Sequence, residues 1–159
     1  MKNTFATLLL LFPMLIGAAC DQETLTPAVG DQNSIAENTD SMKDTLIIKV
    51  GDTEFTATLL DNPTATAFKA MLPLTINMTE LNGNEKYFRL SKNLPTNASN
   101  PGTINSGDLM LFGSNTLVVF YETFATSYSY TRVGKIDNPS GLKSSLGTGN
   151  VTVSIELQN

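Results

Sequence analysis

Two tyrosines and an arginine alternate along one short segment of this sequence, and their spacing suits ligand binding. Tyr128, Tyr130 and Arg132 are each two residues apart, so in an extended chain their side chains point to the same face. Aromatic rings beside a guanidinium can form a binding face for a peptide or a small ligand, through ring contacts and cation–π attraction. The same three residues also fit a structural role at the rim of a β-barrel.

The residue types that the chain lacks exclude several kinds of chemistry. Among its 159 residues there is no His, no Trp and one Cys. These counts exclude catalytic triads that need His, metal sites built from His, and Cys-rich zinc or iron–sulfur sites. The formal net charge is −5, whereas nucleic-acid binding depends on cations that neutralise phosphates. We therefore expect no metal, no cofactor and no nucleic-acid partner.

The single cysteine, Cys20, follows a segment with the features of an export signal. Lys2 precedes an apolar run over residues 5–16, and small residues stand before the cysteine. The run is shorter than the about 20 residues that a transmembrane helix needs, so these features favour a cleaved secretory signal. The stretch Gly17-Ala18-Ala19-Cys20 resembles a bacterial lipobox, in which the cysteine becomes the lipidated first residue. The alternative is an ordinary signal peptide.

The lipobox resemblance implies a three-part organisation. Residues 1–19 are the lipoprotein signal, residues 20–42 a flexible acidic tether, and residues 43–159 the folded domain. The segment 21–42 contains five acidic residues and no basic residue, and it lacks the apolar periodicity that folding requires. The expected location is the bacterial cell envelope, at the periplasmic or outer-membrane face, with the membrane contacted through lipid on Cys20.

The folded domain is predicted to be mainly β, because apolar residues alternate with period two in about eight places. Two pairs, Asn62-Pro63 and Asn138-Pro139, combine a capping side chain with a proline at the first helical position, so each predicts a helix start. Residues 91–107 are rich in Pro, Gly, Asn and Ser and predict a long surface loop, of a length that often carries function. Phe68 and Phe112 are predicted to lie in the core.

Four segments of the domain resemble the cyclophilin-like family of small bacterial domains. They are residues 61–73, 81–88, 106–113 and 127–136, and the likeness extends over residues 45–157. Eight strands with two short helices favour a closed barrel in any case, because closure removes exposed edges. The resemblance implies that same closed eight-stranded barrel with a helix at either end. In true cyclophilins the barrel carries a shallow groove that binds proline-containing peptides and speeds their cis–trans isomerisation.

Arg89 is the residue to which the resemblance assigns catalysis. The stretch Tyr87-Phe88-Arg89 is similar to the Phe-His-Arg of cyclophilins, whose arginine donates hydrogen bonds beside the isomerising amide. A guanidinium there weakens the amide resonance that sets a barrier of roughly 20 kcal/mol. The resemblance also places Phe120 near the position that receives the proline ring. Alternatively, Arg89 is an outward strand residue paired with Glu85 or another acid.

The chain also departs from the cyclophilin pattern at the groove. The stretch Val133-Gly134-Lys135-Ile136 is similar to the cyclophilin Phe-Gly-Lys-Val, but Tyr130 stands in the place of the groove histidine. The groove tryptophan has no counterpart, and neither does the Gln-Gly-Gly-Asp stretch that follows the catalytic strand. We therefore expect a membrane-tethered, non-catalytic binding module for a peptide segment or small ligand. Its predicted ligand-binding residues are Phe120, Tyr128, Tyr130 and Arg132.

Two alternatives remain at this point. The first is a peptidyl-prolyl isomerase of low efficiency that uses Arg89, and the second is a purely structural envelope protein. The position of Arg89 separates the binding and isomerase hypotheses, since isomerisation needs its guanidinium in a concave apolar groove.

Overall fold

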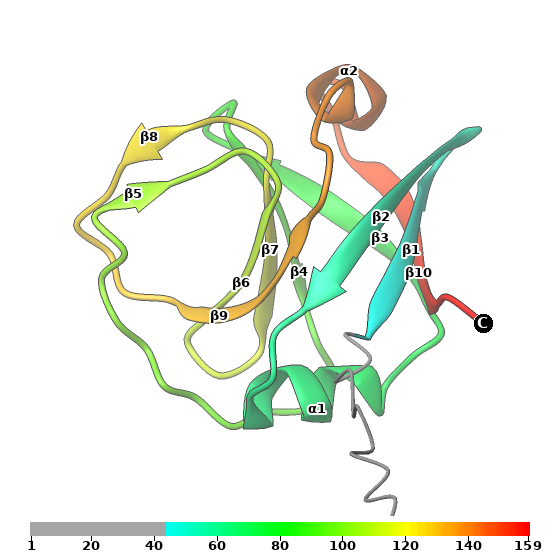
Figure 1. Ribbon diagram of the computed structural model, residues 1–159. Helices are drawn as coiled ribbons and strands as arrows, with labels where there is room; N and C mark the ends of the chain where they lie inside the picture. Colours follow the sequence, from blue (N-terminus) through cyan, green and yellow to red (C-terminus); the bar gives the residue numbers. More distant parts are fainter. Residues whose placement is uncertain (1–43) are drawn as a thin grey trace, which may run out of the picture. The chain divides into compact units, whose positions relative to one another are not determined.

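Eight antiparallel strands close into a barrel in the order β1-β10-β3-β4-β7-β6-β9-β2 (Figure 1). The computed structural model describes residues 44–159. The barrel strands are β1 (Thr45–Val50), β2 (Thr53–Leu59), β3 (Leu74–Leu81), β4 (Glu85–Arg89), β6 (Asp108–Phe112), β7 (Thr116–Phe120), β9 (Thr131–Ile136) and β10 (Val151–Leu157). The predicted mainly β fold, a closed eight-stranded barrel with two short helices, is confirmed. The predicted signal, tether and lipidated Cys20 lie outside the described residues.

Alternating apolar side chains fill the interior of the barrel. Leu46, Ile48 and Val50 belong to the interior cluster and are at most 4% exposed. Across the β1–β10 ladder, Ile48 pairs with Ile155 and Val50 with Val153. Burying side chains of this size contributes roughly 1.5–3 kcal/mol each, and a slip of one residue would turn all of them outward. The interior is therefore packed with side chains, and its pattern fixes the register. The described residues, 44–159, fall within one compact unit.

Helix α1 (Pro63–Lys69) begins where its capping signal predicts. The Asn62 side chain accepts a hydrogen bond of 2.8 Å from the Ala65 N–H, and Pro63 occupies the first helical position, where a missing N–H does no harm. Phe68 is fully buried in the interior cluster, as predicted. Because α1 lies at one end of the barrel (Figure 1), Phe68 seals that end against water.

Helix α2 (Leu142–Leu146) covers the opposite end of the barrel (Figure 1) and begins later than predicted. The Asn138 side chain accepts a hydrogen bond from the Ser140 N–H, which makes a local turn and not a helix cap. Gly141 then takes a φ of 82°, and this left-handed backbone separates the turn from the helix. The predicted helix start at Asn138 is therefore wrong, although Leu142 and Leu146 are both buried.

A short second sheet lies against the outside of the barrel. Strand β5 (Thr103–Ile104) pairs with β8 (Phe124–Ala125), and Ser99 exchanges two backbone hydrogen bonds of 3.0 Å with Tyr130. Residues 91–107, predicted to be one surface loop, therefore include a strand and a bridge. A second apolar cluster packs between this sheet and the outer face of the barrel. Its buried members are Ile104, Met110, Val118, Phe120 and Tyr130.

A buried lysine ties β4 to the end of the barrel near α2. Lys86 is fully buried and forms an ion pair with Glu80. Its Nζ also donates hydrogen bonds to the carbonyls of Gly147, at 2.9 Å, and Gly149, at 2.6 Å. The Tyr121 hydroxyl donates to the same Glu80 carboxylate. Because a buried cation is tolerated only when paired, this network holds the α2–β10 connection against β4.

Candidate functional site

Strand β4 carries three side chains into a groove on the outer face of the barrel. Glu85, Tyr87 and Arg89 alternate outward into the groove, whereas Lys86 and Phe88 point the other way. The groove encloses about 390 Å³ and crosses β4 and β7, beside β8. Its lining residues are Leu81, Asn82, Asn84, Glu85, Tyr87, Arg89, Phe112, Thr116, Val118, Phe124, Tyr128 and Tyr130.

Aromatic rings make up most of the apolar wall of the groove. The ring of Phe112 lies 5.6 Å from that of Tyr130 and meets Tyr128 edge to face at 6.2 Å. Phe120 contacts Tyr130 at 5.4 Å and Phe124 at 5.8 Å. Such ring pairs contribute roughly 0.5–1.5 kcal/mol beyond the area they bury. Phe112 and Tyr128 are 46% and 64% exposed, so the wall presents apolar ring surface to a ligand.

The groove has an acidic end and a basic end. Glu85 is 9% exposed, and its burial, together with the charge of Glu80, raises the pKa of its carboxyl to about 7. Within residues 44–159 its carboxylate has no hydrogen-bond or ion-pair partner. Arg89, four residues along the same strand, is exposed and forms no ion pair with a described residue. Four strand residues span roughly 13 Å, which separates the two charges.

Three of the predicted site residues lie together in this groove: Arg89, Tyr128 and Tyr130. Phe120 does not line it, because it is fully buried under the rings of Tyr130 and Phe124. Arg132 lines a different pocket. The segment is not one extended strand, since β9 begins at Thr131 and Tyr128 lies in a bend. The shared face predicted for Tyr128, Tyr130 and Arg132 is therefore not formed.

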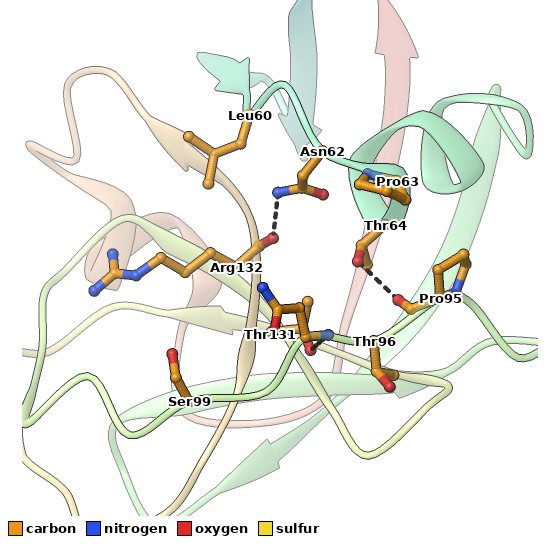
Figure 2. Close-up of a pocket in the computed structure, with 10 residues that line it drawn as sticks. Leu60, Asn62, Pro63, Thr64, Pro95, Thr96, Ser99, Thr131 and Arg132 are labelled. Carbon is orange, nitrogen blue, oxygen red and sulfur yellow. Dashed lines mark hydrogen bonds between the residues drawn. The ribbon is translucent and has the colours of Figure 1, made fainter. Parts of the chain in front are cut away.

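Figure 2 shows the second pocket, of about 320 Å³, which lies beside the start of α1. The Asn62 amide donates a hydrogen bond of 3.0 Å to the Arg132 carbonyl, and the Thr64 hydroxyl donates one of 2.7 Å to the Pro95 carbonyl. The Arg132 guanidinium extends away from these contacts (Figure 2). The hydrogen bonds of Asn62 and Thr64 thus fasten α1 to β9 and to the segment after β4.

Nine of the twelve groove residues were not identified from the sequence as binding residues, among them Glu85, Tyr87, Phe112 and Phe124. The prediction that Phe112 is a core residue is wrong, since it is nearly half exposed. The signal that could have found Glu85 and Tyr87 is the alternation along β4, which puts them on the same face as Arg89. Phe124 belongs to the two-residue strand β8, for which the sequence contains no periodic signal.

Between residues 44 and 159 no helix is long and apolar enough to span a bilayer. The same part of the chain contains no group of three His, Cys, Asp or Glu side chains placed to hold a metal ion.

Comparisons with known proteins identify the family. A family model described as the cyclophilin-like family matches residues 48–156, which is more than half of the chain, and the chain therefore belongs to that family. No curated protein matches the chain. The solution structure of the hypothetical protein AF2241 from Archaeoglobus fulgidus matches with a TM-score of 0.53 and 18% identity, over 73% of this chain and 95% of that one. At this identity the structural likeness extends to the fold alone.

Proposed function

For this member of the cyclophilin-like family, we propose the role of a lipid-anchored module that binds a peptide segment in the outer-face groove without catalysing a reaction. The observation that carries the proposal is the groove wall itself. Phe112 and Tyr128 are large, exposed and in ring contact. An exposed apolar concavity with a few polar groups at its ends is the common form of a binding site.

An extended peptide matches the dimensions of the groove. Glu85 and Arg89 are four residues apart on one strand, or roughly 13 Å, which is the length of about four extended residues. Apolar side chains of such a peptide would pack on the rings of Tyr128 and Phe112, which lie 6.2 Å apart. A small ligand that contacts only the rings is the narrower form of the same proposal.

The anchor is proposed from the sequence motif that ends at Cys20. A lipidated cysteine followed by the acidic segment 21–42 would hold the domain close to a bacterial membrane and leave the groove free to meet partners. Replacement of the cysteine, Cys20→Ser, is expected to abolish the incorporation of radiolabelled palmitate into the protein in the cells that produce it. Wild-type protein that incorporates no label would overturn the lipid anchor.

Peptidyl-prolyl isomerisation is the second candidate, and one observation favours it. Arg89 lines the concave groove, and its guanidinium has no ion-pair partner among the described residues, so it is free to donate to a peptide amide. The buried position of Phe120 argues against a proline pocket at that residue. We therefore rank binding without catalysis above isomerisation.

One NMR experiment separates these possibilities. Residues 44–159 fall within one compact unit, so a fragment of residues 39–159 is mixed with acetylated Ala-Pro and Phe-Pro peptides, and the cis–trans exchange of the peptides is recorded. We expect peptide line broadening and shifts of groove resonances without faster exchange. Acceleration that disappears in Arg89→Ala would establish the isomerase instead, and no perturbation of either partner would reject both roles.

A pair of variants locates the binding. Tyr128→Ala removes an exposed ring from the groove, whereas Arg132→Ala alters an exposed side chain of the other pocket. Both positions are exposed, so the fold tolerates both changes. We expect the first variant to lose peptide binding and the second to keep it. The reverse result would place the ligand at the pocket of Figure 2.

A further inference from the structure

Two hydrogen-bond acceptors stand without partners at one end of the groove. The carboxylate of Glu85, 9% exposed, has neither a hydrogen bond nor an ion pair within residues 44–159. Its neighbour Asn84 also lines the groove, and the side-chain oxygen Oδ1 of Asn84 is buried with no donor in reach. A buried acceptor that lacks a donor costs about 1–3 kcal/mol, and a charged one costs more. Both acceptors would therefore be relieved by a ligand that brings N–H donors.

Within residues 44–159 the protein supplies no cation at this position. Lys86 follows Glu85 in the chain, but it points away from the groove and is bound to Glu80 and two carbonyls. Arg89 shares the face of Glu85 but lies roughly 13 Å along the strand. A cation that pairs with the acidic end of the groove must therefore come from a ligand.

The aromatic rings of the groove favour an organic cation. Tyr87 and Phe124 line the groove with Glu85, and their faces attract a cation that has left bulk water. The two acceptors require donors, so a group with N–H bonds fits better than a quaternary ammonium, which has none. An ammonium or guanidinium on an apolar stem meets both requirements, because the stem packs on the rings while the head reaches the acceptors.

We propose that the Glu85 end of the groove is a subsite for a lysine or arginine side chain of the bound peptide. This inference rests on the proposed function and adds the chemical class of the ligand. Glu85 supplies the charged acceptor, Asn84 a neutral one, and the tyrosine and phenylalanine rings form the walls. The rest of the peptide then extends along β4 toward Arg89.

The subsite depends on pH through Glu85. The charged and titratable groups that face it are Glu80 from β3, Tyr121 after β7, Tyr130 before β9 and, further along β4, Arg89. Burial raises the pKa of both tyrosines, so they stay neutral near pH 7. Hydrogen bonds from Lys86 and Tyr121 outweigh the burial of Glu80 and lower its pKa, so it stays ionised.

Within this set only Glu85, with a pKa of about 7, changes charge between pH 6 and pH 8. A basic side chain stays charged over this range. Its apparent affinity therefore follows the ionised fraction of Glu85, which rises about tenfold across the two units.

The test compares two acetylated, amidated peptides that differ at one residue. Ala-Ala-Lys-Ala-Ala carries the ammonium, and the same peptide with norleucine keeps a four-carbon stem without charge. Each is titrated into residues 39–159 at pH 6 and pH 8 with NMR detection. At pH 8 the lysine peptide is expected to bind at least about tenfold more tightly than the norleucine peptide. At pH 6 most of this difference is lost.

Matched variants assign the effect. Glu85→Gln keeps the size of the side chain and is expected to abolish both the preference for lysine and its pH dependence. Glu54→Gln, which removes an exposed carboxylate from β2, is the control and should retain both. A preference for lysine that survives Glu85→Gln would overturn the subsite.

The same titrations distinguish failure of the subsite from failure of the groove. If both peptides bind equally and Tyr128→Ala weakens both, the groove binds peptides but the proposal of a basic subsite is wrong. If neither peptide binds at millimolar concentration, the proposed function fails together with the subsite.

Discussion

Replacing Glu85 by glutamine is expected to stabilise the fold at pH 8 and to leave its stability unchanged at pH 4. In the native barrel, burial raises the pKa of this carboxyl from 4.5 to about 7. Below pH 4.5 the group is protonated in both the folded and the unfolded chain, so ionisation has no effect on stability. Between pH 4.5 and 7 only the unfolded chain ionises, and the free energy of unfolding falls as pH rises.

The size of this loss follows from the pKa difference. At roughly 1.4 kcal/mol for each pKa unit, full ionisation of Glu85 lowers the free energy of unfolding by at most about 3.5 kcal/mol. The groove is open to water on one side, which screens the charge and brings the expected figure to about 2 kcal/mol. Glu85→Gln removes the ionisable group while it keeps the shape of the side chain, so the loss should vanish.

Urea denaturation of residues 39–159 from pH 4 to pH 8 measures the effect. The difference between wild type and Glu85→Gln is the quantity of interest, because the carboxyls that do not interact with Glu85 titrate equally in both. We expect a difference near zero at pH 4 that grows to about 2 kcal/mol in favour of the glutamine variant at pH 8. Asp52→Asn, which removes an exposed carboxylate that has no ion pair or side-chain hydrogen bond within residues 44–159, should track the wild type throughout. A constant difference at all pH values, or a less stable glutamine variant at pH 8, would refute the assigned pKa and its cause.

Two other changes test how the fold is held together, with chemical denaturation as the measurement. Lys86→Met removes the donor to Glu80 and to two backbone carbonyls. We expect it to lower the free energy of unfolding by about 3 kcal/mol. A free energy of unfolding within about 1 kcal/mol of the wild-type value would contradict the role of this network. Gly134→Ala places a Cβ 2.6 Å from the Thr58 carbonyl oxygen and is expected to cost about 2 kcal/mol or more, whereas the control Gly149→Ala, which meets no atom within 4 Å, should stay within about 1 kcal/mol. Equal effects of the two alanines would show that this close approach of β9 to β2 is not rigid.

The barrel was predictable from the sequence because the side chains that fill its interior alternate with outward-facing ones along each strand, and this pattern is visible over a few residues. Inward positions such as Val153 and Ile155 of β10 alternate with polar residues, and closure follows from the number of strands. The same signal, an Asn-Pro pair, predicted the start of α1 correctly and the start of α2 wrongly. Asn62 caps α1, but Asn138 makes a turn with Ser140. A capping side chain acts only on its own turn of the chain. Whether the following residues form a turn or a helix depends on how they pack against the rest of the fold.

The groove was harder to predict because it depends on a second layer. Met110 and Phe112 have the same phase on β6, yet Met110 is 1% and Phe112 46% exposed. The second apolar cluster, which includes Ile104 of β5, covers Met110, and two-residue strands such as β5 leave no periodic pattern in a sequence. The alternation of apolar residues thus predicts which side chains point out of the barrel, but not which of these are covered by the second layer. Arg89, Tyr128 and Tyr130 were identified because a family resemblance and residue type substituted for that missing information.

A ligand of this barrel must bind outside it, because the interior is filled by side chains such as Phe68 and Leu109, both fully buried. The outer wall of a barrel is convex, and a convex wall offers little contact area. The β5–β8 sheet and the segment around Tyr130 add a second layer that turns part of this wall into a concavity. Because that layer is fastened by main-chain bonds between Ser99 and Tyr130, its aromatic wall is positioned before any ligand arrives. A preformed wall lowers the entropy lost on binding. Even a short peptide can therefore bind to a domain of this size.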